Sequence, residues 1–234
     1  MSECAARLPY DQLQSFVRHD LYAPTAMLKH FLQSMLDLPM DAESIRETLG
    51  FALGLTSDLA GLLQLLGDAL QVGTAGGEGE SVPLQAVHLG AWMGQLATEL
   101  GWLGSSEQAH YQSTSGGHEV LLEEGAARRA LQAIVYQWSR MGNQPGRVEL
   151  RLAEDDPSKL QIFKPVGSVP LDVLGRALRG DAEDWGEFLR KLPACGLPLR
   201  VARGLLADGC GAQLCLVDDP QHGPILTIAF WPAS

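Results

Sequence analysis

Two long apolar-periodic segments in the N-terminal third constrain the fold of this chain more than any other feature. Residues 9–38 and residues 42–72 each carry apolar side chains at helical spacing. The segment Leu38-Pro39-Met40-Asp41 separates them, because proline disfavours helix in the residue before it and Asp41 is a suitable N-cap. The pattern predicts a helical hairpin. A hairpin this apolar cannot bury both of its faces alone, so we expect two copies to associate into a four-helix bundle.

The remainder of the chain alternates helix and strand patterns. Residues 73–82 are rich in glycine and acid and predict a linker, which divides the chain into domains 1–72 and 83–234. The second domain is expected to be a sandwich with helices on one face of a sheet, so the fold class is α+β. Helices are expected at 89–101, 126–141, 171–178, 185–192 and 199–207, and strands at 109–113, 119–123, 147–153, 159–163, 213–217 and 225–231. Turns are expected at Asp155-Asp156-Pro157 and Asp218-Asp219-Pro220.

Composition excludes several classes of protein. The 234 residues have a formal net charge of −11, which argues against binding nucleic acid, since that would need a basic surface. No apolar run reaches the roughly 20 residues that span a bilayer, and the N-terminus lacks the pattern of a signal peptide. The 4 cysteines form no Cys-x-x-Cys pair. We therefore expect a cytoplasmic protein without membrane insertion, with reduced cysteines and no bound metal.

The first helix contains a histidine beside a carboxylate. His19 precedes Asp20, and Pro24 follows five residues after the histidine. On a helix of 100° per residue, His19 falls roughly 140° from the centre of the apolar stripe and should face solvent. A neutral imidazole is nucleophilic near pH 7, and Asp20 could orient or activate it. Pro24 costs about 3 kcal/mol in a helix interior and is expected to bend the helix just past the histidine.

This His-Asp-x-x-x-Pro pattern resembles the phosphoacceptor box of bacterial histidine kinases, and the order of hairpin, linker and sandwich resembles the core of that family. The resemblance covers nearly the whole chain. It implies that His19 receives a phosphoryl group, that the hairpin pairs in a homodimer, and that residues 83–234 form a domain like the ATP-binding domain of these kinases. His30 lacks an adjacent acid and is expected to be a solvated surface residue.

The boxes that bind nucleotide in that family are degenerate here. Gln137 stands where the resemblance places an asparagine that holds magnesium, and Trp138 replaces a small neighbour; magnesium tolerates little change in geometry. In the first glycine box, Lys164 and Gly167 follow a strand, and lysine donates where the adenine amino group needs an acceptor.

The last glycine box resembles Gly196-Leu197-Pro198-Leu199, where Pro198 removes a backbone N–H and fixes φ. The plain alternative is that this segment is a loop before a helix. Taken with the other two boxes, these departures lead us to expect no bound ATP, magnesium or other cofactor.

Three functions remain open from the sequence. The first is a dimeric histidine phosphotransferase that carries a phosphoryl group on His19 between the aspartates of receiver domains, in response regulators or hybrid kinases. The second is a divergent histidine kinase without its own sensor domain. The third is a non-enzymatic regulator that binds a kinase or a response regulator. The second would bind ATP, and the third would not need His19 to be phosphorylated.

Overall fold

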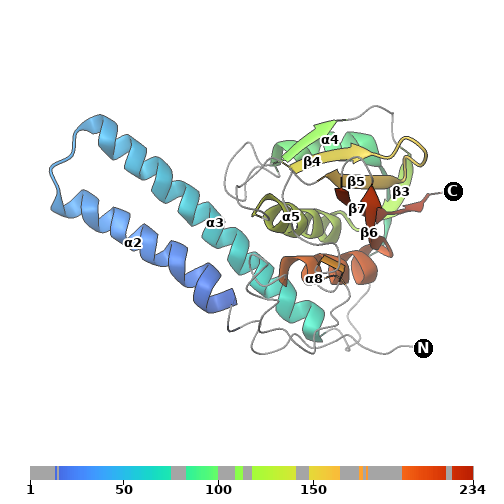
Figure 1. The fold of residues 1–234 in the computed structure, drawn as a ribbon, viewed down its shortest axis with the longest axis horizontal. Helices are drawn as coiled ribbons and strands as arrows, with labels where there is room; N and C mark the ends of the chain where they lie inside the picture. The colour runs from blue at the N-terminus through green and yellow to red at the C-terminus, as the bar shows by residue number, and fades with distance from the viewer. Residues whose placement is uncertain are drawn as a thin grey trace.

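The structure of the chain, a computed structural model, describes residues 14, 16–74, 83–99, 109–112, 118–140, 148–163, 174, 175, 178, 197–219 and 223–233. Within these ranges the molecule consists of a projecting helical hairpin and an α/β domain against which the end of the second hairpin helix packs (Figure 1).

The hairpin contains a single π-helical turn, η1 (Val17–Leu21), followed by α2 (Tyr22–Asp37) and α3 (Ala42–Thr74). Helix α3 begins and ends close to its predicted bounds, and α2 ends close to its own. The single helix predicted over residues 9–38 is interrupted by η1, and its predicted start lies outside the described residues. The rings of Phe31 and Phe51 stack with centroids 6.1 Å apart, which sets the antiparallel register of the two helices. The apolar stripe predicted for the first helix lies toward α3, except that Val17 is exposed.

The second domain builds two sheets. Its elements are β1 (Gln85–His88), α4 (Leu89–Glu99), β2 (Ala109–Gln112), β3 (Glu119–Leu122), α5 (Glu124–Arg140), β4 (Val148–Leu152), β5 (Lys159–Phe163), α8 (Leu197–Gly204), the π-helical turn η5 (Leu205–Gly209), β6 (Gln213–Asp219), β7 (Gly223–Ala229) and β8 (Trp231–Pro232). A five-stranded sheet has the order β2-β4-β5-β7-β6, and a smaller one has the order β1-β3-β8. Only the β2–β4 pair is parallel among the described strand pairs.

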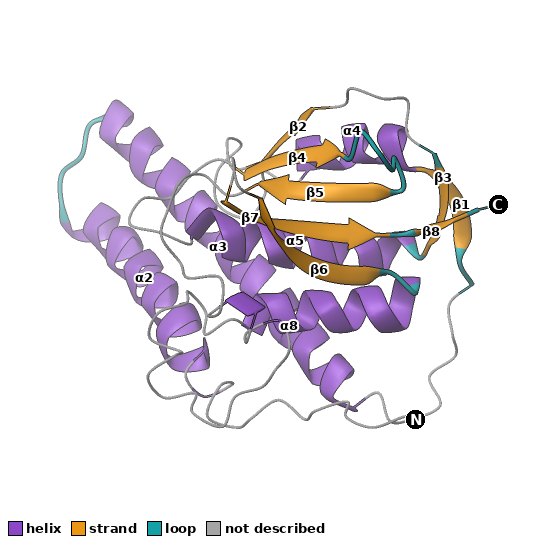
Figure 2. Ribbon diagram, turned by 45° about the vertical axis from the view of Figure 1, so that its right-hand side comes forward, coloured by secondary structure: helices purple, strands orange, loops and turns teal. Residues whose placement is uncertain are grey.

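Helices α5 and α8 pack side by side behind the larger sheet (Figure 2). Buried side chains alternate along β4, where Val148, Leu150 and Leu152 lie in the core, as expected for a strand with one covered face. On the other face, Arg151 forms an ion pair of 2.7 Å with Glu149 and lies 4.7 Å from the ring centre of Phe163. The predicted sandwich of helices on one face of a sheet is therefore confirmed.

Several sequence predictions need correction. Strand β1 was not predicted. Asp218 and Asp219 continue β6 and pair with β7, because the backbone ladder extends further than the turn chemistry indicated. Helix α8 begins at Leu197, two residues before its predicted start. Cys210 is buried while Cys215 is exposed, and Cys4 and Cys195 lie outside the described residues.

Most residues of the predicted linker and of the helices at 171–178 and 185–192 also lie outside the described residues.

Helix α3 also departs from the expectation that no segment could span a membrane. By length and composition, residues Ala42–Leu70 are apolar enough to cross one, with a mean hydropathy of 1.5, and this window is 18% buried in the chain. The core helix of a helical bundle passes the same test. Its C-terminal part carries the charged residue Asp68 and packs on the second domain through buried Leu65 and Ala69.

The start of α3 provides a test of the hairpin. An Asp41 carboxylate oxygen accepts the backbone N–H of Ser44 at 2.8 Å, and this hydrogen bond lowers the pKa of Asp41. A group with a depressed folded pKa contributes stability above its unfolded pKa and loses it as the pH falls through the folded value. Asp41→Ala should therefore lower the thermal midpoint at neutral pH, and the difference from wild type should shrink as the carboxyl is protonated. Circular dichroism melts across acid pH measure this.

Asp41→Asn is the matched control, since asparagine also caps helices well. A midpoint for Asp41→Ala that equals wild type at neutral pH would contradict the assignment.

Candidate functional site

His19 lies in the π-helical turn η1, immediately before α2. The turn is closed by the backbone N–H of Tyr22, which donates to the carbonyl of Val17 five residues earlier. Asp20 is part of the same turn and is half-buried. The His19 side chain lies outside what the structure describes, so the predicted exposure of the imidazole stays a prediction.

Pro24 explains the irregular backbone at this point. It is the third residue of α2 and has no N–H, so it cannot donate to the carbonyl of Asp20 as an ordinary helical residue would. The next residue, Thr25, donates its hydroxyl to the carbonyl of Leu21 at 2.6 Å. Single π-helical turns within α-helices occur frequently at functional sites. The irregular turn lies before Pro24 and includes His19, whereas the sequence predicted a bend just past His19.

The turn is anchored at its N-terminal end by Phe16. This side chain is 0% exposed and belongs to the continuous apolar core, which also contains residues of α3, α5 and α8. Leu21, at the other end of the turn, packs partly buried against the same core. The backbone that carries His19 is therefore attached at both ends to apolar packing.

Helix α5 carries Gln137, the residue at which the resemblance to histidine kinases placed a magnesium ligand. Gln137 and Trp138 are each 0% exposed. Among the described residues, neither amide atom of Gln137 has a hydrogen-bond partner. A magnesium ligand needs an accessible oxygen with room for water and phosphate around it. No group of three or more His, Cys, Asp or Glu side chains that could hold a metal is found in the described part of the chain.

The glycine boxes are only partly described. Lys164, Gly167 and Gly196 lie outside the described residues. Pro198 is buried in the first turn of α8, at its second residue. Proline is tolerated in the first turn of a helix, where backbone N–H groups lack intrahelical partners. Its position is thus explained by the start of α8, and the segment is helical where a loop was the plain alternative.

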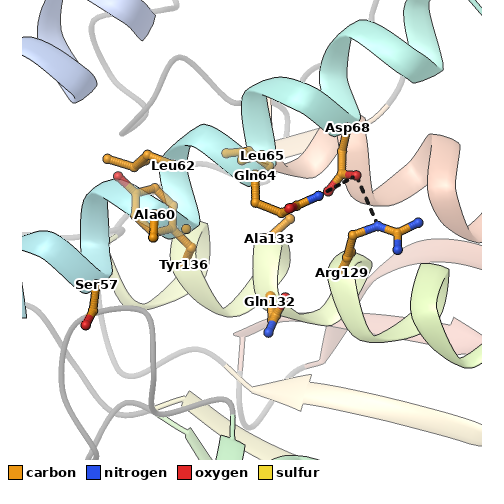
Figure 3. Close-up of a pocket in the computed structure, with 11 residues that line it drawn as sticks. Ser57, Ala60, Leu62, Gln64, Leu65, Asp68, Arg129, Gln132, Ala133 and Tyr136 are labelled. Atoms are coloured by element: carbon orange, nitrogen blue, oxygen red, sulfur yellow. Dashed lines mark hydrogen bonds and ion pairs between the residues drawn. The ribbon is translucent and has the colours of Figure 1, made fainter.

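A pocket of about 320 Å³ separates α3 from α5 (Figure 3). At one end of it, Asp68 on α3 faces Arg129 on α5, with 3.0 Å between Asp68 Oδ1 and Arg129 Nε. The Gln64 side-chain amide donates to the same oxygen at 3.3 Å. At the other end lie Ser57 and Tyr136. The contact between Asp68 and Arg129 is an ion pair without the alignment of a hydrogen bond.

Sequence reasoning missed this pair. One signal was available, because Asp68 is the only charged residue between Leu59 and Gly77. A lone carboxylate in an apolar helix usually has a partner when it is buried. The partner itself could not be named, because Arg129 is distant in sequence and two arginines stand side by side on α5.

Comparison with known proteins supports the fold alone. No family model and no curated protein matches the sequence. Among solved structures, a bacterial phosphotransferase superposes with a TM-score of 0.55 at 14% identity, covering 97% of this chain and 98% of the other. The histidine kinase ThkA, solved in complex with the response regulator protein TrrA, gives a TM-score of 0.55 at 13% identity, covering 95% of this chain and 61% of the other.

Full-length ShkA in complex with AMPPNP gives a TM-score of 0.54 at 17% identity, covering 97% of this chain and 47% of the other. At these identities the likeness is one of fold. The predicted resemblance in fold is thereby confirmed: the chain has a histidine-kinase-like core, in which a helical hairpin precedes a sandwich like the ATP-binding domain of those kinases.

The buried amide of Gln137 allows a test of whether this side chain lacks hydrogen-bond partners in the folded protein. An enclosed amide without partners costs about 1–3 kcal/mol, so Gln137→Leu should raise the free energy of unfolding by about 1 kcal/mol. Urea denaturation with an unchanged m-value measures it. Gln132→Leu, on the pocket side of the same helix, is the control and should give no such gain. A loss of stability in Gln137→Leu would show that the amide is hydrogen-bonded in the protein.

Proposed function

We propose that this chain is a two-component phosphorelay protein, which carries a phosphoryl group on His19 between receiver-domain aspartates. The observation that carries the proposal is the turn η1, which places His19 and Asp20 together just before Pro24 in a chain with a histidine-kinase-like core. A helix that only packed would not require this irregular turn.

The chemistry asked of the chain is nucleophilic substitution at phosphorus. An unprotonated imidazole nitrogen of His19 attacks the phosphorus of a receiver aspartyl phosphate, an N–P bond forms, and the P–O bond to the aspartate breaks, which releases the carboxylate. A second receiver aspartate reverses these steps. Asp20 orients the imidazole tautomer, and the receiver supplies the magnesium ion, so this chain contributes mainly positioning.

Loss of the nucleotide site is the second part of the proposal. The buried positions of Gln137 and Trp138 support it, since neither side chain is accessible to solvent, as a ligand of a hydrated metal ion would need to be. The alternative of a divergent kinase deserves a direct test, because ShkA has a similar fold and was solved with AMPPNP.

We further propose that the protein acts in the cytoplasm as a homodimer, with receiver domains as partners and without nucleic acid. Support for the dimer comes from the large apolar side chains exposed on the hairpin, namely Tyr22, Met27, Leu32 and Leu36 on α2 and Ile45, Leu49, Phe51, Leu53, Leu63 and Leu70 on α3. Pairing two hairpins would cover such side chains in a four-helix bundle. The fold shared with ThkA, which was solved with a response regulator protein, supports the receiver partner.

Oligomeric state provides a prediction for the dimer. Leu53 is 69% exposed on the hairpin, and Leu53→Glu should convert the protein to a monomer by placing a charge where the partner hairpin packs. Sedimentation equilibrium measures it. Val217→Glu, at an exposed apolar position on β6, is the matched control and should leave the mass unchanged. A wild-type monomer would refute the four-helix bundle.

Phosphotransfer provides the test of the function. Purified protein is incubated in parallel with labelled ATP and magnesium, and with a labelled phosphorylated receiver domain from the same cell. We expect acid-labile label from the receiver alone and complete loss of it in His19→Ala, since no other group then replaces the nucleophile. His30→Ala, which removes an exposed histidine of α2, should behave as wild type.

The other outcomes decide between the alternatives. Label from ATP on His19 would establish a divergent histidine kinase. Absence of label in both reactions, with a receiver shown to phosphorylate other histidine proteins, would favour the non-enzymatic regulator.

A further inference from the structure

Helix α3 packs against two different parts of the molecule along its length. With 33 residues it is about twice as long as α2, which has 16. Its N-terminal half packs against α2, and its C-terminal half packs against α8 of the second domain (Figure 1). The position of the second domain relative to the hairpin is therefore set along this one helix.

The contact between α3 and the second domain lies close to η1, the turn that carries His19. His19 comes about twelve residues before Phe31, so in the antiparallel register set by the stacked Phe31 and Phe51 rings it lies level with the region of Leu63. Asp68 is five residues further along α3, roughly 8 Å at 1.5 Å per residue. The ion pair between Asp68 and Arg129 thus links the two domains within about two helical turns of His19.

Apolar packing covers only part of the space between α3 and α5 at this point, although Leu65 and Ala69 of α3 belong to the shared core. The pocket of about 320 Å³ separates the two helices, and its walls are mainly apolar. Across that gap, Asp68 reaches Arg129 at 3.0 Å, while Gln64 holds the same carboxylate oxygen at 3.3 Å (Figure 3). The polar bridge joins named atoms across the gap and so adds a specific distance to the less directional apolar contacts around it.

The bridge is poorly suited to adding stability. Asp68 is 3% exposed, and burial raises the pKa of its carboxyl even though Arg129 acts in the opposite direction. The Arg129 side chain is 33% exposed, so only the carboxylate is fully removed from water and solvent weakens the attraction. The desolvation of Asp68 offsets part of what remains, and in several systems such pairs contribute specificity of arrangement. The pair is better explained by the geometry that it imposes.

We propose that Asp68 and Arg129 are positioning residues whose ion pair fixes the second domain relative to His19, so that a receiver domain reaches the histidine in one orientation. This inference rests on the proposed phosphotransfer function. Neither residue touches the reacting atoms. Breaking the pair should loosen the arrangement of the domains and weaken productive receiver docking, while the intrinsic reactivity of His19 is retained.

The experiment reverses the charges in the full-length protein. Asp68→Arg and Arg129→Asp are made singly and together, with Asp68→Asn and Arg129→Gln as milder versions in case a reversed charge prevents folding. Two readouts are taken: the distance distribution between spin labels on α2 and β6, and the KM and kcat for transfer from a phosphorylated receiver. Labels are placed at Gln33→Cys and Gln213→Cys, both exposed positions, after the four native cysteines are replaced by alanine. Labelled protein is diluted with unlabelled protein.

Each single variant should broaden the distance distribution and raise KM about tenfold with little change in kcat, because misplacement affects docking before chemistry. The double reversal should restore both readouts. Asp156→Asn is the matched control: it breaks an ion pair of 3.0 Å with Lys159 inside the β4–β5 turn and should change neither readout.

Unchanged distances in the single variants would overturn the proposal, and so would broadened distances with an unchanged KM. Failure of wild-type protein to accept a phosphoryl group would instead contradict the proposed function. In that case the distances still decide whether the pair fixes the domains, since broadening that the double reversal restores supports this and an unchanged distribution overturns it.

Discussion

The packing of the C-terminal part of α3 on the second domain is the constraint on which the rest of the structure depends. One continuous helix supplies apolar side chains to α2 at one end and to the α/β domain at the other, so neither domain has a complete core of its own without it. Large apolar side chains on its N-terminal half stay exposed in a single chain. The same surface explains why α3 passes a test for a membrane span and why pairing of hairpins is the natural way to cover it.

The second domain has a fold like that of the ATP-binding domain of histidine kinases, and two positions of its nucleotide boxes lie buried in its packing. Gln137 lies enclosed in α5, and Pro198 contributes to the first turn of α8. Both substitutions fit packing: an indole at Trp138 fills space, and a proline starts a helix. The same domain packs on α3 through apolar residues of the shared core and through the ion pair of Asp68 with Arg129.

Much of this fold could be predicted from the sequence, because helical and strand periods reflect burial on one face. Helix α3, the end of α2 and strands β4 and β5 lie within a few residues of their predicted bounds. Other features depend on partners that periodicity does not reveal. Strand β1 exists through pairing with β3, Asp218 joins a strand through the β7 ladder, and Asp68 finds Arg129 only in three dimensions. The π-helical turn was missed because it follows from hydrogen bonding around Pro24 rather than from a pattern of side chains.

In the proposed function, that turn and the ion pair would position a reaction to which the chain contributes little chemistry. Pro24 denies the helix one backbone donor, and the wider turn that results carries the histidine. Phe16 fixes the entry to the turn by full burial in the shared core. If receiver and carrier exchange a phosphoryl group, the barrier is lowered mainly by holding phosphorus in line between nitrogen and oxygen. In the proposed transfer, the η1 turn of the hairpin and a second domain held against α3 would together meet that requirement.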